Sequence, residues 1–365
     1  MKLRTLRRLA RWLGPWASPT AVPPDVDREE VTVSEALGVE AWVYRRRDRD
    51  IVGSVLLVPG LHFLGPRDVR LDRFARVLAH SGFLVLTPFL PSYLRLVVKP
   101  SVLEETEAAL DALLRHPERP RGQAPGMMSI SFGSMPALRV AARRGEDLAN
   151  VLIFGGFADF RRTLRFALRG EGERANDPLN APAVVTNLLP FLDGADGIES
   201  DVDRELLAQR MLAYCARTWG RPEMKVERAY VAQAEAEASE LEAGPLRTLF
   251  LRACRVEPGI EEIIERALLR AGDHFDWIDP RPHFGKIARP VTLVHGVTDD
   301  VIPFEEGRAL LEALSPHTRT RLLLTGLYGH THVDGVGHGP RELAGELVAM
   351  TRILRAMASL SDRVD

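Results

Sequence analysis

Apolar runs alternate with amphipathic stretches over the first part of the chain. The apolar runs occupy residues 51–60, 83–89, 126–131 and 150–157. Runs that are apolar at nearly every position are typical of central parallel strands, which are covered on both faces. Between them, residues 70–81, 101–117 and 134–145 place apolar side chains at helical spacing. This alternation predicts βαβ units and a mostly parallel sheet.

The pattern changes between residues 159 and 287, where helical periodicity continues without a convincing strand. The helical stretches are 159–170, 186–194, 204–220, 226–244, 245–255 and 260–272. The sheet pattern then resumes with strands at 289–296 and 320–326 and helices at 303–315 and 340–360. A helical block inserted between two strands of one sheet predicts an all-helical cap over residues 159–287. Residues 28–158 and 288–365 would form the α/β core, with helices on both faces of its sheet.

Residues 1–27 are predicted to form a basic amphipathic segment followed by a Pro-rich linker. One side of a helix over residues 1–16 would carry Leu3, Leu6, Leu9 and Leu13, and the other mostly Lys2, Arg4, Arg7, Arg8 and Arg11. Such a helix can lie in a membrane interface, so we predict peripheral membrane contact through residues 1–16. The alternative is a terminal helix packed on the domain. No later run is long and apolar enough to span a bilayer.

Composition narrows the class of protein. The chain has 365 residues, 45% of them hydrophobic, and a net charge of −2, so a nucleic-acid partner is not expected. Its two cysteines, Cys215 and Cys254, are far apart in sequence and lack metal-binding spacing. They indicate two buried thiols in a reducing compartment. We therefore predict a cytoplasmic protein, with membrane association at the inner surface.

The stretch "GMMSISFGSMPAL" over residues 126–138 contains the candidate nucleophile. Ser131 stands between an apolar run and a helical pattern, which is where a strand-to-helix turn exposes a side chain at the carboxyl end of a sheet. Gly133 follows two residues later. Ser129 stands two residues earlier, where a G-x-S-x-G turn has its first glycine. Ser129 is small enough for a tight turn, and its hydroxyl is expected to hydrogen-bond locally.

With this turn the chain resembles the α/β-hydrolase superfamily, whose triad follows the order Ser, Asp or Glu, His. The segment "HGVTDDVIP" after the strand at 289–296 is similar to the family's acid loop. The resemblance implies that Asp299 is the triad acid and that Asp300 is only its neighbour. This similarity is fairly specific, because the segment follows the family's order of a strand, a glycine, an acid, a proline and a helix.

The resemblance implies a catalytic histidine in the loop after the strand at 320–326. That loop offers His330, His332 and His338, of which His330 fits best and His332 competes. The family's oxyanion amides correspond to Phe132, directly after the nucleophile, and to Leu61 in "VPGLHFLG".

The resemblance therefore implies a serine hydrolase that cleaves a carboxylic ester through an acyl-enzyme, without a cofactor. Leu, Phe and Ala in the cap helices favour an apolar or lipid-like acyl group. One alternative is an α/β-hydrolase fold that only binds a ligand. Another is a metal-dependent hydrolase that uses the segment "HTHVD" from His330. Asp159 follows a strand and could contact the substrate. We prefer to interpret it as a helix cap or an ion-pair partner.

Overall fold

The computed structural model describes residues 2–47, 49–170, 176–326 and 340–362. The chain divides into two compact units. Unit 1 contains residues 1–94, 99–158 and 279–365, and unit 2 contains residues 95–98 and 159–278. The sequence predicts an inserted helical block over residues 159–287. In the structure residues 279–287 belong to unit 1 instead. A 3-10 turn at Arg281–Lys286 packs there against helices α5 (Ser134–Arg144) and α12 (Phe304–Leu314).

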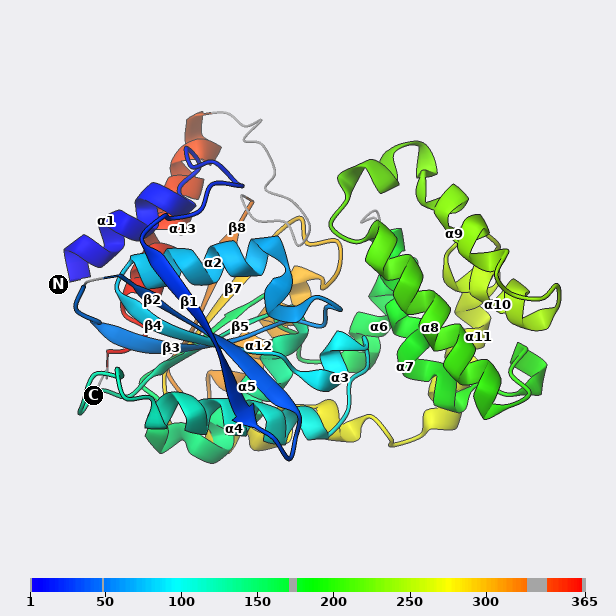
Figure 1. Cartoon of the computed structure of the whole chain (residues 1–365), viewed down its shortest axis with the longest axis horizontal. Helices are drawn as coiled ribbons and strands as arrows, with labels where there is room; N and C mark the ends of the chain where they lie inside the picture. Colours follow the sequence, from blue (N-terminus) through cyan, green and yellow to red (C-terminus); the bar gives the residue numbers. More distant parts are fainter. Residues whose placement is uncertain (1, 48, 171–175, 327–339, 363–365) are drawn as a thin grey trace. The chain divides into compact units, whose positions relative to one another are not determined.

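Unit 1 is built on one eight-stranded sheet with the order β1-β2-β4-β3-β5-β6-β7-β8 (Figure 1). Strand β2 pairs antiparallel with both β1 and β4, and every other pairing is parallel. The strands are β1 Val26–Ser34, β2 Val39–Arg46, β3 Gly53–Val58, β4 Phe83–Pro88, β5 Gly126–Ile130, β6 Val151–Phe154, β7 Val291–Gly296 and β8 Thr320–Thr325. The mostly parallel sheet predicted from the apolar runs is confirmed.

Helices cover both faces of this sheet (Figure 1). One face carries α1 (Lys2–Leu13), α2 (Val69–His80) and α13 (Pro340–Ala358). The opposite face carries α4 (Ser101–Arg115), α5 (Ser134–Arg144) and α12 (Phe304–Leu314). A short helix, α3 (Pro91–Leu94), follows β4. Both sides of the central strands are therefore buried, which explains why their sequences are continuous apolar runs.

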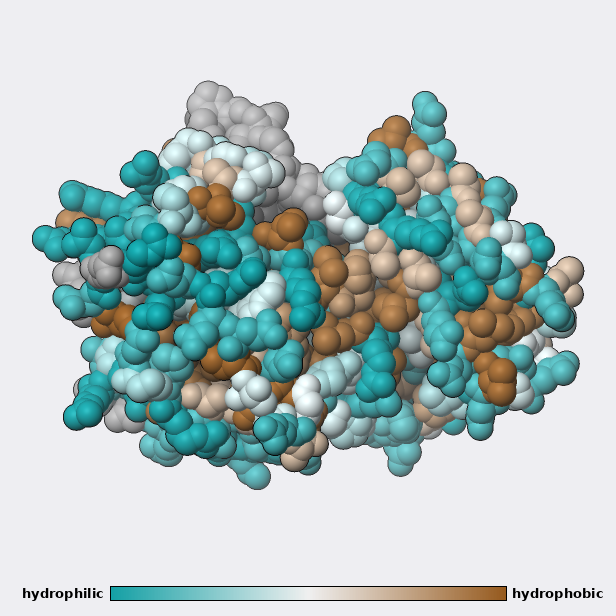
Figure 2. Space-filling view, viewed as in Figure 1, coloured by the Kyte–Doolittle hydropathy of each residue, from teal (hydrophilic) through white to brown (hydrophobic). Residues whose placement is uncertain are grey.

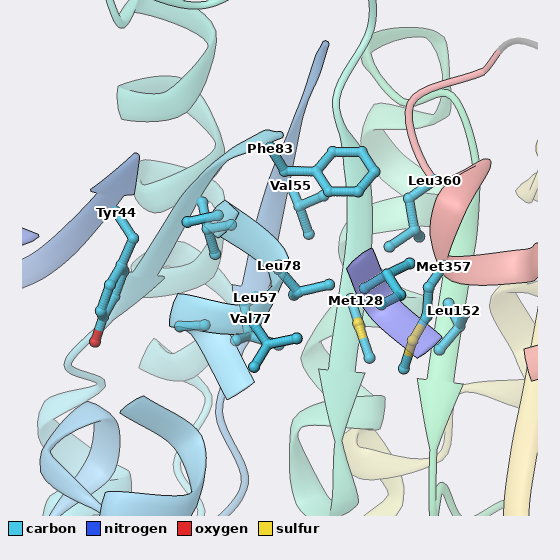
Figure 3. Close-up of a cluster of buried hydrophobic side chains, with 14 of the residues drawn as sticks. Tyr44, Val55, Leu57, Val77, Leu78, Phe83, Met128, Leu152, Met357 and Leu360 are labelled. Carbon is cyan, nitrogen blue, oxygen red and sulfur yellow. The ribbon is translucent and has the colours of Figure 1, made fainter. Parts of the chain in front are cut away.

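A cluster of buried apolar side chains lies between the sheet and the layer of α2 and α13 (Figure 3). Leu57, Met128 and Leu152 come from three neighbouring strands and are at most 1% exposed. Leu78 from α2 and Met357 from α13 pack against the same face. Helices α2 and α13 thus share one core with three of the central strands.

Helix α1 belongs to this core as well. Leu9 is fully buried within the cluster, and α1 packs against α2 and α13. The apolar side of α1 is therefore occupied inside unit 1, which is the alternative foreseen from the sequence. Leu3 on α1 and Trp16 just after it remain 60% and 66% exposed. Membrane contact through residues 1–16 stays a prediction, and it would have to use the outward side of the helix.

Strand β1 was not predicted from the sequence. Its stretch "VDREEVTVS" carries four charged residues in succession, which hides its alternation. It is an edge strand with most of its side chains outside the core, and charges are tolerated there. Glu30 accepts a hydrogen bond of 3.0 Å from the indole nitrogen of Trp42, and Arg28 lies 3.7 Å above the same ring. The charged strand is thus held by side-chain contacts to β2.

Unit 2 is helical over the residues described between 159 and 278. Its helices are α6 Phe160–Arg169, α7 Ala181–Leu188, α8 Asp201–Thr218, α9 Tyr230–Ala238, α10 Pro245–Ala253 and α11 Ile260–Ala271. The carboxylate of Asp196 is buried and accepts hydrogen bonds from Arg266 and Arg270 of α11.

Cys215 and Cys254 are both buried and free. In the part of the chain that the structure describes, no helix is long and apolar enough to cross a bilayer.

Candidate active site

Ser131 occupies a strained turn between β5 and α5. Its φ is +54°, a left-handed conformation that non-glycine residues rarely adopt and that costs about 1–3 kcal/mol. A 3-10 turn at Ser131–Gly133 leads directly into the helix that begins at Ser134. This is the strand–turn–helix geometry that projects a nucleophile above the end of a sheet. Ser131 itself is 6% exposed.

Two glycines let this turn approach the loop after β3. A Cβ on Gly133 would lie 2.5 Å from the carbonyl oxygen of Pro59, which is closer than real Cβ atoms come to backbone. A Cβ on Gly60 would lie 3.2 Å from the Cβ of Ser131 and 3.1 Å from the carbonyl oxygen of Ile130. The turn and the loop are therefore in direct backbone contact, and a side chain at Gly133 would separate them.

Ser129 lies within the strand, beside Val58 of β3 and Ile153 of β6. It is fully buried, and its Oγ has no hydrogen-bond partner among the residues that the structure describes. The expectation that this hydroxyl bonds locally is therefore wrong. A buried hydroxyl without a partner keeps its desolvation cost, so Ser129 contributes small size and no polar contact.

Tyr93, a residue that sequence reasoning missed, fixes the position next to Ser131. Its hydroxyl donates a hydrogen bond of 3.0 Å to the carbonyl oxygen of Phe132. Burial raises the pKa of Tyr93, so the hydroxyl keeps its proton and remains a donor. The ring of Phe132 also contacts that of Phe157, with ring centres 5.1 Å apart. No sequence motif marks Tyr93, because α3 is one turn long.

The loop that carries Leu61 is held by a neutral histidine. His62 accepts a hydrogen bond of 3.2 Å at Nδ1 from the Leu64 amide. Burial, the largest effect, lowers the pKa of His62 to about 4, so the ring is neutral at pH 7. Its remaining proton is then on Nε2, which lies 3.5 Å from Oδ2 of Asp68. The amide of Leu61 donates no hydrogen bond to any described residue and is available to a ligand oxygen.

Asp68 connects this loop to α2. It caps the helix by accepting hydrogen bonds from the amides of Arg70 and Leu71, at 2.9 and 3.3 Å. The Arg70 guanidinium also binds both of its carboxylate oxygens. Burial opposes ionisation of Asp68, but these hydrogen bonds outweigh it and lower its pKa. The ionised Asp68 therefore places a fixed negative charge near His62.

Asp299 lies in the loop after β7 and is 3% exposed. Its Oδ1 accepts hydrogen bonds from the amides of Val301 and Ile302, at 2.9 and 2.8 Å. These amides hold the side chain in one orientation. The neighbouring Asp300 is more exposed. The sequence-based choice of Asp299 over Asp300 remains a prediction, and the fixed carboxylate of Asp299 suits the part of a triad acid.

His295 on β7 orients this acid loop and was not singled out from the sequence. Its Nε2 donates to the carbonyl oxygen of Ile302 at 2.9 Å and lies 3.5 Å from Oδ2 of Asp299. On the other side of the ring, a Cβ on Gly307 would lie 2.8 Å from Nδ1. His295 is 2% exposed and packed on both edges, so it is a positioning residue for Asp299.

His330, His332 and His338 lie outside the described residues, as does the whole "HTHVD" segment. The chain enters this segment from the end of β8, where Thr325 pairs with Gly296 of β7. The Thr325 carbonyl also accepts a hydrogen bond of 3.0 Å from the Val297 amide. The chain thus leaves β8 beside the start of the acid loop, and Gly326 stands four positions before His330. The choice between His330 and His332 stays a prediction.

Parallel pairing places the candidate residues at one edge of the sheet. Strands β3, β5, β6 and β7 run in the same direction and are neighbours, so the loops after their carboxyl ends lie together. Leu61, Ser131 and Asp299 follow three of these strands. The structure brings the Leu61 loop into contact with the Ser131 turn. Asp299 follows β7, which is separated from β5 by strand β6.

Two carboxylates, one after β6 and one after the acid loop, have structural contacts. Glu306 on α12 is fully buried, and its Oε2 accepts a hydrogen bond of 2.9 Å from the Ala158 amide. It thereby fixes the loop after β6 to the helix that follows the acid loop. Asp159 caps α6 by accepting a hydrogen bond of 2.9 Å from the Arg162 amide. This agrees with the interpretation of Asp159 as a helix cap.

Sequence comparison identifies no relative: no protein-family model and no curated protein matches the chain. Among solved structures, an esterase from the bacterial hormone-sensitive lipase family is 13% identical with a TM-score of 0.49, over 100% of this chain and 98% of that one. The 2,6-dihydroxy-pseudo-oxynicotine hydrolase is 17% identical with a TM-score of 0.48, over 93% and 70%. Pyrococcus horikoshii acylaminoacyl peptidase is 10% identical with a TM-score of 0.48, over 93% and 42%. The chain spans about two fifths of the length of the acylaminoacyl peptidases it matches.

The chain has an α/β-hydrolase fold. Its mostly parallel eight-stranded sheet is covered by helices on both faces, and a helical unit is inserted between β6 and β7. A left-handed serine stands at the turn from β5 to α5, where this fold places its nucleophile. The fold predicted from the sequence is confirmed.

Proposed function

We propose that the protein is a serine hydrolase that cleaves a carboxylic ester through an acyl-enzyme. The observation that carries the proposal is the left-handed Ser131 at the β5–α5 turn, packed against the loop that follows β3. Backbone strain of this kind persists only where surrounding contacts enforce it, and it is concentrated at functional sites. A serine held only for packing would not require it.

In the proposed reaction, the Ser131 hydroxyl attacks the ester carbonyl. His330 or His332 accepts the hydroxyl proton and later gives a proton to the leaving alcohol. Asp299, held by two backbone amides, orients this histidine and stabilises its charged form. Water then hydrolyses the acyl-enzyme, with the same histidine as base.

The amides of Leu61 and Phe132 are proposed to bind the oxyanion that forms during each attack. Two amides aimed at the developing charge stabilise the transition state more than the substrate, because the charge is absent from the substrate. Tyr93 supports this arrangement by fixing the Phe132 carbonyl. His62 supports it by holding the loop after Leu61. No cofactor takes part in these steps.

For the substrate we propose an ester with an apolar or lipid-like acyl group. The support is the composition of unit 2, whose helices are rich in Leu, Phe and Ala. An apolar acyl chain gains free energy when it leaves water for such surroundings, by about 0.8 kcal/mol for each buried CH₂ group. Turnover should therefore rise with acyl length. Turnover of short p-nitrophenyl esters without activity on acyl chains of about eight carbons or more would refute this preference.

The enzyme is tested by covalent labelling with a fluorophosphonate. Labelling of the wild type that disappears in Ser131→Ala and persists in Ser129→Ala supports the proposal. An unlabelled, folded wild type would favour a binding protein on the same fold. An ester panel run on His330→Ala and His332→Ala separates the two candidate bases, since removing a triad member costs on the order of 10⁴–10⁶ in kcat.

A further inference from the structure

Helix α1 presents four arginines without an acidic partner. Arg4, Arg7 and Arg11 are exposed and Arg8 is half-buried, and α1 contains no acidic residue. Among the described residues, none of the four makes an ion pair or a hydrogen bond. Arginines elsewhere in unit 1 are often paired; Arg76, for example, binds Asp72 at 2.8 Å. The charges on α1 are therefore left for a partner outside the fold.

Helix α13 extends this basic surface. It packs against α1, and its Arg352 and Arg355 are exposed and unpaired over the described residues. Figure 1 shows α1 and α13 on the same side of the sheet as α2. In Figure 2 the side chains over α1 are predominantly hydrophilic. We call the six arginines of these two helices the arginine face.

An acidic residue near the middle of α1 is already paired. Asp25, the acidic residue beside Arg8, is bound by Arg46 at 2.6 Å and by His80 at 2.6 Å. Burial, and then the charges of Arg46 and Arg49, lower the pKa of Arg8. Positive charge thus dominates around the middle of α1.

Exposed apolar side chains accompany the arginines. Leu3 and Trp16 are 60% and 66% exposed, and Leu347 and Val348 on α13 are 42% and 50% exposed. Trp16 lies on an ordered turn, because Arg73 of α2 donates to the carbonyl oxygens of Trp12 and Ser18 at 2.7 and 2.8 Å. Exposed tryptophan and leucine beside arginines are typical of segments at a bilayer interface.

We propose that the arginine face docks the protein on an anionic lipid bilayer. The arginines contact the lipid head groups, while Leu3 and Trp16 reach the boundary with the acyl chains. Helix α1 stays packed on unit 1 during docking, because Leu9 on its other side is fully buried in the core. A nucleic acid would satisfy the arginines but would leave the exposed leucine and valine side chains in water. A membrane accounts for both features.

The test uses the full chain and vesicle flotation. Vesicles of phosphatidylcholine alone are compared with vesicles that contain about 30% phosphatidylglycerol, across a salt series. The protein should float with the anionic vesicles only, and less so as salt rises. Each arginine near an anionic surface contributes about fivefold in partitioning, so Arg4→Gln/Arg7→Gln should lower binding roughly 30-fold. Trp16→Ser should lower the binding that persists at high salt.

The matched control is Arg115→Gln/Arg121→Gln, which removes the same charge from exposed positions at the end of α4 and in the loop after it. Figure 1 shows α4 on the face of the sheet opposite to α1. This variant should bind like the wild type. Equal partitioning into neutral and anionic vesicles would overturn the proposal, as would an equal loss in the control. Retention on heparin without binding to vesicles would also overturn it. Unchanged thermal unfolding verifies that each variant is folded.

Discussion

Gly133→Ala tests whether the Ser131 turn depends on close contact with the loop after β3. The φ of Gly133 is −62°, so alanine fits the local backbone. The obstacle is space, because the new Cβ would lie 2.5 Å from the Pro59 carbonyl oxygen and 2.9 Å from that of Val58. Both atoms belong to backbone, and no flexible side chain can move aside. We therefore expect the loop and the turn to separate by about half an ångström or more.

The separation should affect both stability and catalysis. Overpacking of a close-packed interior costs about 1–3 kcal/mol of the free energy of unfolding. In the proposed hydrolase it would also move the Leu61 amide away from Ser131, and a displacement of about 1 Å in a reacting geometry costs on the order of 10²-fold in rate. Because Gly133 touches no substrate in this scheme, kcat should fall more than KM rises.

Urea unfolding measures the first effect, and hydrolysis of an activated ester measures the second. The control is Gly345→Ala on α13, where a Cβ would meet nothing within 4 Å. Alanine is the better helix former, so the control should be stabilised by up to ~1 kcal/mol and keep its turnover. A Gly133→Ala protein that unfolds and turns over like this control would refute the close contact.

Three further predictions concern side chains around the site. Ser129→Ala removes a buried hydroxyl that has no partner among the described residues. Urea unfolding should therefore show equal stability or a gain of up to ~1 kcal/mol. A loss of more than ~1 kcal/mol would mean that the hydroxyl makes a hydrogen bond. Tyr93→Phe removes one hydrogen bond to the Phe132 carbonyl. We expect kcat to fall about tenfold with KM unchanged. An unaltered kcat would show that Tyr93 does not position the site. The folded-state pKa of His62, about 4, lies below its ordinary value of 6.5, so its stabilising contribution is complete above pH 6.5 and is lost as the pH falls toward 4. His62→Asn should therefore reduce the acid loss of stability by about 3 kcal/mol, and equal losses in both proteins would contradict a neutral His62.

Much of the fold could be predicted because the central strands are buried on both faces. Burial of both faces makes each strand a continuous apolar run, and such runs are visible without any structure. Edge strand β1 escaped prediction for the converse reason: most of its side chains are outside the core, so its charges obscure the pattern. The packing of α1 could be named from the sequence only as an alternative. Its apolar stripe fits a membrane and a protein core equally well, and only the structure shows Leu9 inside unit 1.

Sequence order nominates Ser131 and Asp299 because each follows the end of a strand, and their roles stay predictions. The residues that hold them in place were not predicted, because their contacts join distant parts of the chain. Tyr93 contacts Phe132 across 39 positions, and Glu306 contacts Ala158 across 148. Neither contact leaves a local motif. Sequence order can therefore nominate candidate reacting groups, but the side chains that fix the surrounding loops are visible only in the structure.

The missing first glycine of the Ser131 turn can be explained from these contacts. Position 129 is a strand residue between Val58 and Ile153, whereas position 133 meets the backbone of the loop after β3. A small side chain is tolerated at position 129, which pairs with Val58 and Ile153 within the sheet. Any side chain is excluded at position 133, because its Cβ would meet the carbonyl oxygens of Pro59 and Val58. The turn thus requires glycine on only one side of Ser131, and Ser129 is compatible with a strained nucleophile.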